Sequence, residues 1–231
     1  MEYCDSFKLR MSQIYISYVR KILDLKDFVL NTPLAIRKYQ NERIKLEQSR
    51  YIRYPLEKMV NFDINLVLEM SLIKIFSEYE NFLTVFFYEL KKIDSIYGFR
   101  KSNTNIMYLA RYLEQLFNVK ISSELTCWDK LVENYYRRNA YVHTKGKINK
   151  NYIQNVPNYS ENDMYKKLWI DLIYVRECTD NILELFEYLF MKIVIEYFHC
   201  NNIDQILLGI NERRNYGINS LHLSKFKLKI T

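Results

Sequence analysis

Residues 64–93 read INLVLEMSLIKIFSEYENFLTVFFYELKKI and carry the longest helical pattern of the chain. Large apolar side chains recur here at the three- and four-residue steps that place them on one face of an α-helix. Asp63 has a side chain suited to an N-cap, so we expect a long helix to begin after it. The members of the stripe are Leu66, Ile73, Phe76, Glu80, Leu83, Phe87 and Leu90.

Glu80 is the one carboxylate in this stripe. An unpaired buried charge is costly, so a glutamate on an apolar face normally has a cationic partner. Two interpretations are open. In the first, Glu80 lies at the edge of the stripe or pairs with a structural arginine. In the second, Glu80 orients a cationic residue of an active site.

The composition predicts further helices rather than a sheet. The 231 residues include only 4 Gly and 3 Pro, whereas a sheet protein of this size needs many tight turns. The length suits one domain, or one domain with an appended subdomain. We therefore predict an all-α fold, a helical bundle extended by an N-terminal helical hairpin.

The first 60 residues predict that hairpin. Asn31, Thr32 and Pro33 indicate a stop and a restart, with Thr32 as N-cap and Pro33 in the first helical position. A strongly charged helix follows at about 34–53 and ends before Pro55. The preceding helix, over about residues 7–30, has an apolar stripe formed by Met11, Tyr15, Tyr18, Ile22, Leu25 and Val29.

Several segments are expected after the long helix, and one of them is a helix that ends near Gly146, where a C-terminal glycine stop is expected. Ser123 is a possible cap upstream of that segment, whose inward face includes Trp128, Leu131, Tyr135 and Val142. The expected segments are a loop at 97–104, a helix at 105–117, a helix that ends near Gly146, a loop at 147–161, a long helix at 164–198 and a short helix at 203–210.

The chain is accordingly divided into three parts. Residues 1–60 form the hairpin extension, residues 61–200 form the main helical domain, and residues 201–231 form a basic tail. The net charge of +7 lies in the flanks, because residues 1–60 carry 12 Lys and Arg against 7 Asp and Glu, and residues 61–143 carry 10 against 10. Basic flanks attract polyanions through counterion release, so the charge permits contact with nucleic acid without demonstrating it.

The cysteines and the N-terminus predict a cytoplasmic protein. Cys4, Cys127, Cys178 and Cys200 are dispersed without a C-x-x-C pair, which argues against a zinc site and against a disulfide framework. The first residues lack the apolar core of a signal peptide. The most apolar window, residues 182–198, contains 4 charged residues and is not expected to span a bilayer. We expect no cofactor, no metal site and no membrane partner.

A polar cluster before Gly146 contains the residue types that RNA cleavage requires. Arg137, Arg138, Asn139 and His143 lie in one helical segment, where Asn139 and His143 share a face because they are four residues apart. Cleavage needs a base for the 2′-hydroxyl proton, an acid for the departing 5′-oxygen and a cation for the phosphate charge. Histidine transfers protons near neutral pH, and arginine binds phosphate through its planar fork. The alternative is a structural histidine at a helix end beside surface arginines.

This cluster resembles a motif of the HEPN superfamily. Residues 137–153, RRNAYVHTKGKINKNYI, are similar to the R-x4–6-H region of bacterial HEPN domains that have RRN-x-x-VH followed by a glycine and an N-x-x-Y pattern. Residues 79–83, YENFL, resemble the acidic pattern in the first helix of those domains. The resemblance covers residues 62–200 approximately and implies a bundle of the HEPN type.

The resemblance also implies a function and a site. The implied catalytic residues are Arg138, Asn139 and His143, and the implied supporting residues are Arg137, which adds phosphate affinity, and Glu80. HEPN domains commonly dimerise so that two motifs form one cleft, cleave RNA without a metal ion, and serve in toxin–antitoxin or phage-defence systems.

Three hypotheses follow. The leading one is a ribonuclease toxin or defence effector whose partners are RNA, a second copy of the chain and an antitoxin or defence-system protein. The second is a non-catalytic helical module that dimerises or binds nucleic acid or a protein, because some HEPN domains are inactive. The third is an antitoxin or regulator that binds nucleic acid through its basic flanks. Lys145 stands where one HEPN subgroup has a tyrosine that accepts a nucleotide, so regulation of that kind is not expected.

Overall fold

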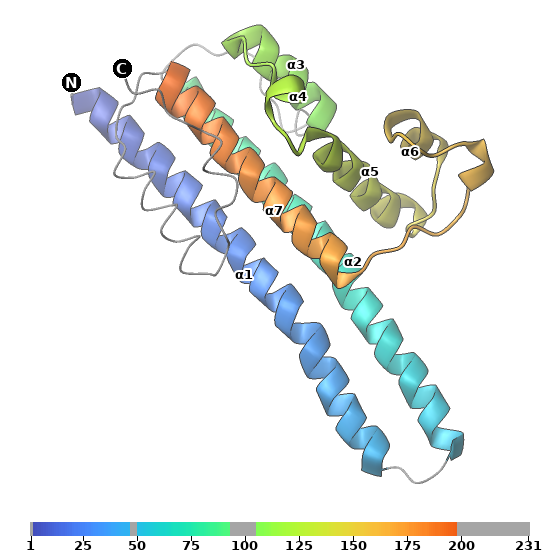
Figure 1. Ribbon diagram of the computed structural model, residues 1–231. Helices are drawn as coiled ribbons and strands as arrows, with labels where there is room; N and C mark the ends of the chain where they lie inside the picture. The colour runs from blue at the N-terminus through green and yellow to red at the C-terminus, as the bar shows by residue number, and fades with distance from the viewer. Residues whose placement is uncertain (1, 47–49, 93–104, 198–231) are drawn as a thin grey trace.

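The described part of the chain is built from helices, and short turns and extended segments join those that follow residue 117 (Figure 1). The computed structural model describes residues 2–46, 50–92 and 105–197. No strand element occurs within these ranges, and the predicted all-α helical bundle is confirmed. The elements are α1 (Glu2–Leu46), α2 (Arg50–Lys91), α3 (Ile106–Phe117), α4 (Ile121–Glu124), α5 (Trp128–Thr144), α6 (Lys150–Asn155), the 3₁₀ turn η2 (Glu161–Asp163), α7 (Leu172–Leu189) and the π-helix η3 (Phe190–Tyr197).

The break expected in the first helix at residues 31–33, with Thr32 as an N-cap, is wrong. α1 continues through Pro33 to Leu46 and α2 begins at Arg50, so the corner of the hairpin lies between residues 46 and 50. Proline removes one backbone hydrogen bond, but it bends rather than ends a helix that is held by packing on both sides. Pro33 is itself buried, as is Val29 one turn earlier, and this packing carries α1 across the proline.

The prediction that a long helix begins after Asp63 is also wrong. α2 contains Pro55 near its beginning and Asp63 in its interior, so neither residue marks a helix end. α2 continues through both because it runs alongside α1, and the two helices extend together beyond the rest of the bundle (Figure 1). The division of the chain near residue 60 stays a prediction. The loop expected at 97–104 and the helix and tail expected beyond 200 lie outside the described residues.

The core forms where α1, α2 and α7 pack together. Phe82 of α2 stacks on Phe186 of α7 with ring centroids 3.9 Å apart, and Tyr18 of α1 meets Phe82 edge-on at 5.6 Å. Burying one large apolar side chain contributes roughly 1.5–3 kcal/mol, so this contact forms a stable platform for α5. The predicted stripe of α1 is buried at Met11, Tyr15, Tyr18, Ile22 and Val29.

The segment between α5 and α7 contains more structure than the predicted loop. α6 and η2 lie within it, and an isolated antiparallel bridge joins Lys147 to Lys167. The Leu168 amide donates to the Gly146 carbonyl at 2.8 Å. This pairing keeps the chain extended before α7, so the helix expected from residue 164 begins instead at Leu172. The carboxylate of Asp171 caps it there by accepting a hydrogen bond from the Tyr174 amide at 2.7 Å.

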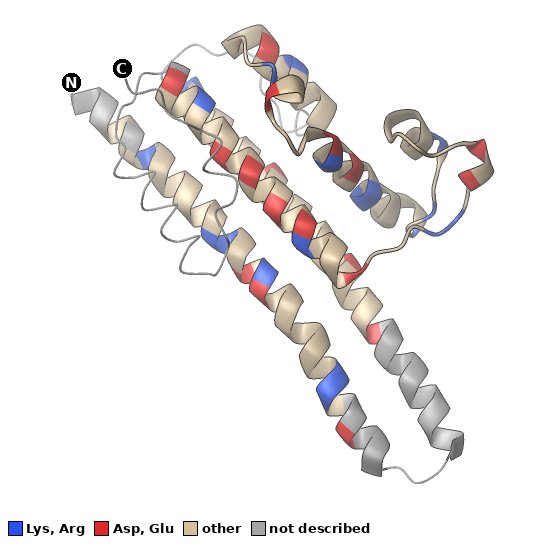
Figure 2. Cartoon of the chain, viewed as in Figure 1, with Lys and Arg blue, Asp and Glu red and all other residues tan. Residues whose placement is uncertain are grey.

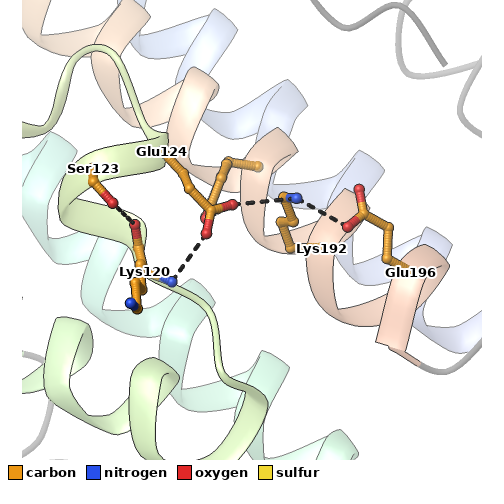
Figure 3. Close-up of polar contacts among 6 residues, drawn as sticks. Lys120, Ser123, Glu124, Lys192 and Glu196 are labelled. Atoms are coloured by element: carbon orange, nitrogen blue, oxygen red, sulfur yellow. Dashed lines mark hydrogen bonds and ion pairs between the residues drawn. The ribbon is translucent and has the colours of Figure 1, made fainter. Parts of the chain in front are cut away.

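An ion-pair network fixes α4 to the C-terminal end of the bundle (Figure 3). The Nζ atom of Lys192 in η3 lies 3.2 Å from Oε2 of Glu124 and 3.0 Å from Oε2 of Glu196. The Lys120 amide donates to Oε1 of Glu124 at 3.1 Å. Burial alone would raise the pKa of Glu124, but its hydrogen bonds to Lys192 and to the Lys120 amide lower that pKa below its ordinary value.

Candidate active site

α5 carries the three residues of the predicted catalytic set. Trp128 and Leu131 are buried against the bundle as predicted, whereas Val142, expected on the same face, is 44% exposed. Cys127 occupies the N-cap of α5 without capping it, because its thiol donates to the Asn181 carbonyl instead, and the expected cap Ser123 lies inside α4. α5 packs on both α2 and α7, so successive side chains of this helix meet different neighbours.

Arg138 lies against α2, where it meets Glu80. Its Nη2 atom is 3.0 Å from Oε1 of Glu80, and its Nη1 atom donates to Oδ1 of Asn139 at 2.9 Å. The Arg138 and Glu80 side chains are only 16% and 26% exposed, so water screens this ion pair less than one on the open surface. Glu80 is thus the partner of an arginine, which satisfies its charge whether Arg138 is structural or belongs to an active site.

His143 lies in the last turn of α5 and is exposed to solvent. Asn139 is one turn earlier on the same face of α5. Arg138 projects about 140° around the helix from His143 and is linked to Asn139 by its hydrogen bond. Arg138, Asn139 and His143 are together called the motif row. No described residue donates a hydrogen bond to the imidazole, accepts one from it or forms an ion pair with it. The imidazole is therefore accessible to a substrate and able to take or give a proton.

Arg137 lies outside the motif row. Its side chain is buried, and its Nη1 atom donates to the carbonyl oxygen of Trp169 at 2.8 Å. Its Nη2 atom forms an ion pair with Glu133, and its guanidinium lies over the Tyr174 ring, 4.2 Å from the centroid. These contacts tie α5 to the extended segment before α7. The guanidinium of Arg137 thus bonds protein groups in this structure, and its implied role in phosphate binding stays a prediction.

The remaining residues of the resemblance shape the turn after α5. Lys145 and Gly146 both have positive φ, and the Gly146 amide donates to the Ala140 carbonyl at 2.9 Å. Asn149 then caps α6 by accepting a hydrogen bond from the Tyr152 amide at 2.9 Å, and Tyr152 is buried. The glycine and the N-x-x-Y pattern therefore have a structural explanation that does not depend on catalysis.

A cavity of about 440 Å³ lies beside the end of α5, and sequence reasoning missed it. It is bounded by α2, by Tyr141 and Lys145, and by the extended segment that contains Trp169. Residues 167–170 alternate between exposed and buried in the structure, as an extended segment does, but three of these four residues are apolar, so the sequence offered no signal for this alternation. The lining residues are Asn65, Leu66, Glu69, Tyr141, Lys145, Lys167, Leu168, Trp169 and Ile170.

Two further findings concern the part of the chain that the structure describes. No group of three or more His, Cys, Asp or Glu residues within it is placed to hold a metal ion. No described helix combines the length and the apolar character needed to cross a membrane.

Comparisons of the chain with models of known protein families, with curated proteins and with solved structures found no match. The chemistry of the site therefore has to be argued from its own geometry. One chain contributes one arginine and one imidazole to the motif row, since His143 is the single histidine within the described ranges.

Proposed function

We propose that the chain is a metal-independent endoribonuclease of the HEPN type, acting as a toxin or phage-defence effector, with a composite active site at a homodimer interface. The observation that carries the proposal is the motif row. A guanidinium anchored by Glu80, an amide that accepts a hydrogen bond from it, and an exposed, unpartnered imidazole follow one another in the last turns of α5. An antitoxin or another defence-system protein is the expected regulator.

The proposed reaction uses these groups as base, acid and charge partner. The imidazole of one His143 takes the proton of the 2′-hydroxyl, and the 2′-oxygen attacks phosphorus as the bond to the 5′-oxygen breaks. The imidazolium of the second copy returns a proton to the departing 5′-oxygen. Arg138 stabilises the charge on the phosphate oxygens, with Glu80 and Asn139 holding its orientation. The products are a 2′,3′-cyclic phosphate and a free 5′-hydroxyl.

A second copy is required because one motif row has a single imidazole. Exposed apolar side chains on α2 and α5, the helices that carry Glu80 and the motif row, suit such a contact. Met70 of α2 is 57% exposed and Val142 of α5 is 44% exposed. Ile73, one turn after Met70 on the same helix, is half-buried. Apolar side chains around a polar centre are typical of an interface that excludes water from a shared site.

The test is cleavage of a labelled single-stranded RNA by the purified chain in the presence of EDTA. We expect fragments that end in a 2′,3′-cyclic phosphate, and no cleavage of the same sequence made with 2′-O-methyl sugars. His143→Ala and Arg138→Ala should each reduce the rate by at least about 100-fold. The matched controls are His222→Ala and Arg111→Ala, which remove the same residue types outside the motif row. Undiminished cleavage by both motif variants would falsify the proposal.

A second candidate function is a non-catalytic helical module that dimerises or binds nucleic acid or a partner protein. The ion pair between Arg138 and Glu80 favours it, because that pair gives the arginine a structural purpose. This candidate predicts that no RNA is cleaved. It also predicts that His143→Ala leaves binding of the partner unchanged.

A further inference from the structure

We propose that the cavity beside the end of α5 is a nucleobase subsite for single-stranded RNA. In this subsite Trp169 stacks on an unpaired base, and the lysines of the adjoining turn hold the phosphate backbone. The inference deepens the proposed function and rests on it for the kind of nucleic acid.

The cavity has the size and lining of a small-ligand site. Its volume of about 440 Å³ falls within the range of roughly 300–1,000 Å³ that is common for such sites. Tyr141 and Leu168 supply apolar walls, and their mutual position is fixed by a 2.6 Å hydrogen bond from the Tyr141 hydroxyl to the Leu168 carbonyl. The amide of Asn65 and the carboxylate of Glu69 add donors and acceptors that can meet the edge of a base.

Trp169 is an exposed aromatic side chain on a fixed backbone. It is 68% exposed although it lines the cavity, while its neighbours Leu168 and Ile170 are buried. Its carbonyl oxygen accepts a hydrogen bond from the buried Arg137 at 2.8 Å. The indole thus stands outside the core on an ordered support, which is the arrangement of a stacking platform.

The charge around the cavity is positive and largely uncompensated. Lys145 lines the cavity, and Lys147 and Lys150 follow it in the adjoining turn. All three are exposed, and none has an ion-pair partner among the described residues. Lys167, which also lines the cavity, is paired with Glu69 at 3.1 Å, and its Nζ atom donates to the Lys145 carbonyl at 3.2 Å. Figure 2 shows this basic colour on both extended segments that join α5, α6 and α7.

Together these features favour a polyanion with accessible bases over a second copy of the chain. Lysines are depleted from the cores of protein interfaces, because burying them removes their hydration. They gain from phosphate contacts through counterion release. A base inside a duplex cannot enter a side cavity without unstacking, so the occupant is a single strand.

The test uses the full-length His143→Ala chain, so that binding is measured without cleavage. The probe is a fluorescein-labelled RNA dodecamer of mixed sequence, either alone or annealed to its complement. We expect the single strand to bind more tightly than the duplex. Adding Trp169→Ala should weaken single-strand binding by about 5- to 100-fold, which is the usual range for one stacked base. Adding Lys145→Ala with Lys147→Ala should reduce the slope of log Kd against log salt by about 2.

Two control variants and one optical signal accompany these measurements. Tyr165→Ala removes an aromatic side chain that is 75% exposed on the same segment but does not line the cavity. Lys130→Ala removes an exposed lysine from the other end of α5. Both should bind as the parent does. RNA should also quench tryptophan fluorescence, because Trp169 is exposed whereas Trp128, the other tryptophan, is 6% exposed.

Three results would overturn the subsite. These are equal binding by the Trp169→Ala variant, equal affinity for the duplex, or an indole that becomes shielded from acrylamide as the free protein is concentrated. The last result would show that a second copy covers Trp169. Failure of the proposed function gives a different pattern. A chain that never cleaves RNA but binds it through Trp169 would contradict the nuclease proposal and still support the subsite.

Discussion

Arg137 and Arg138 are adjacent in the sequence but have different partners in the fold. Consecutive helical residues point about 100° apart, so on α5 one side chain meets the segment before α7 and the other meets α2. The Arg137 guanidinium bonds Trp169 and Glu133, and the Arg138 guanidinium bonds Glu80. Substituting each arginine should therefore change a different property of the protein.

Arg137→Ala is expected to destabilise the fold. It leaves the Trp169 carbonyl without its hydrogen bond and Glu133 without its cation in a largely buried setting. Such losses cost roughly 2–4 kcal/mol. Urea denaturation followed by circular dichroism measures the change, with Arg111→Ala on the exposed face of α3 as the control. A variant as stable as the parent would mean that these contacts are not needed to hold the segment.

The sequence predicted the motif row better than it predicted the surroundings of that row. Helical spacing alone places Asn139 and His143 on one face. The pairing of Arg138 with Glu80 joins two distant helices, and no local pattern specifies which cation a buried glutamate meets. Trp169 was missed because the segment around it was assigned to a helix, where its exposure on an extended backbone could not be foreseen.

At the scale of the elements, the turn after α5 sets the direction of the chain that follows this helix. Gly146 has a φ of +74°, and a Cβ atom there would lie 2.6 Å from Cε1 of Tyr141. The Gly146 carbonyl also accepts the bond that keeps Leu168 beside it. The orientation of Tyr141 and the position of the extended segment therefore both depend on this residue having no side chain.

Gly146→Ala should lower stability by roughly 1–3 kcal/mol, because alanine is strained at positive φ and its methyl group overlaps the Tyr141 ring. Thermal and urea unfolding measure the effect. Lys145→Gly is the matched control, since Lys145 has a φ of 53° that glycine adopts without strain. That variant should unfold no more easily than the parent. Equal destabilisation by both variants would contradict this explanation.

The contact between α4 and η3 should weaken in acid. The pKa of Glu124 is lowered in the folded chain, so its stabilising effect is complete above the ordinary value of 4.5 and is lost as pH falls through the lower folded pKa. Glu124→Gln should therefore destabilise the protein at about pH 7, and the difference from the parent should shrink below about pH 4. Denaturation at both pH values, repeated with Lys192→Met, checks this. Equal destabilisation by Glu124→Gln at both pH values would contradict the lowered pKa of Glu124.

Helix ends were the elements least predictable from sequence. Pro33 and Thr32 form a strong local signal for a break, yet packing of α1 on its neighbours carries the helix through them. The start of α7 depends on a backbone bridge between Lys147 and Lys167, which a single-sequence pattern cannot contain. The buried stripes of α1 and α2 were predictable because they repeat over many turns and depend only on helical periodicity.

At the scale of the whole molecule, the proposed reaction requires two chains. One motif row offers a single imidazole, whereas the proposed reaction uses one imidazole as base and another as acid. The exposed apolar side chains of Met70 and Val142 lie on the two helices that carry Glu80 and the motif row. The proposed reaction requires that a dimer formed there bring the two His143 residues into one cleft.

The most direct test is the specific activity of the chain at a series of dilutions, with the oligomeric state followed in parallel by analytical ultracentrifugation. The account predicts that cleavage of single-stranded RNA per chain falls in step with the fraction of dimer, and that the monomer is inactive. Constant activity per chain in solutions that contain only monomer, or a dimer that cleaves no RNA at any concentration, would contradict it.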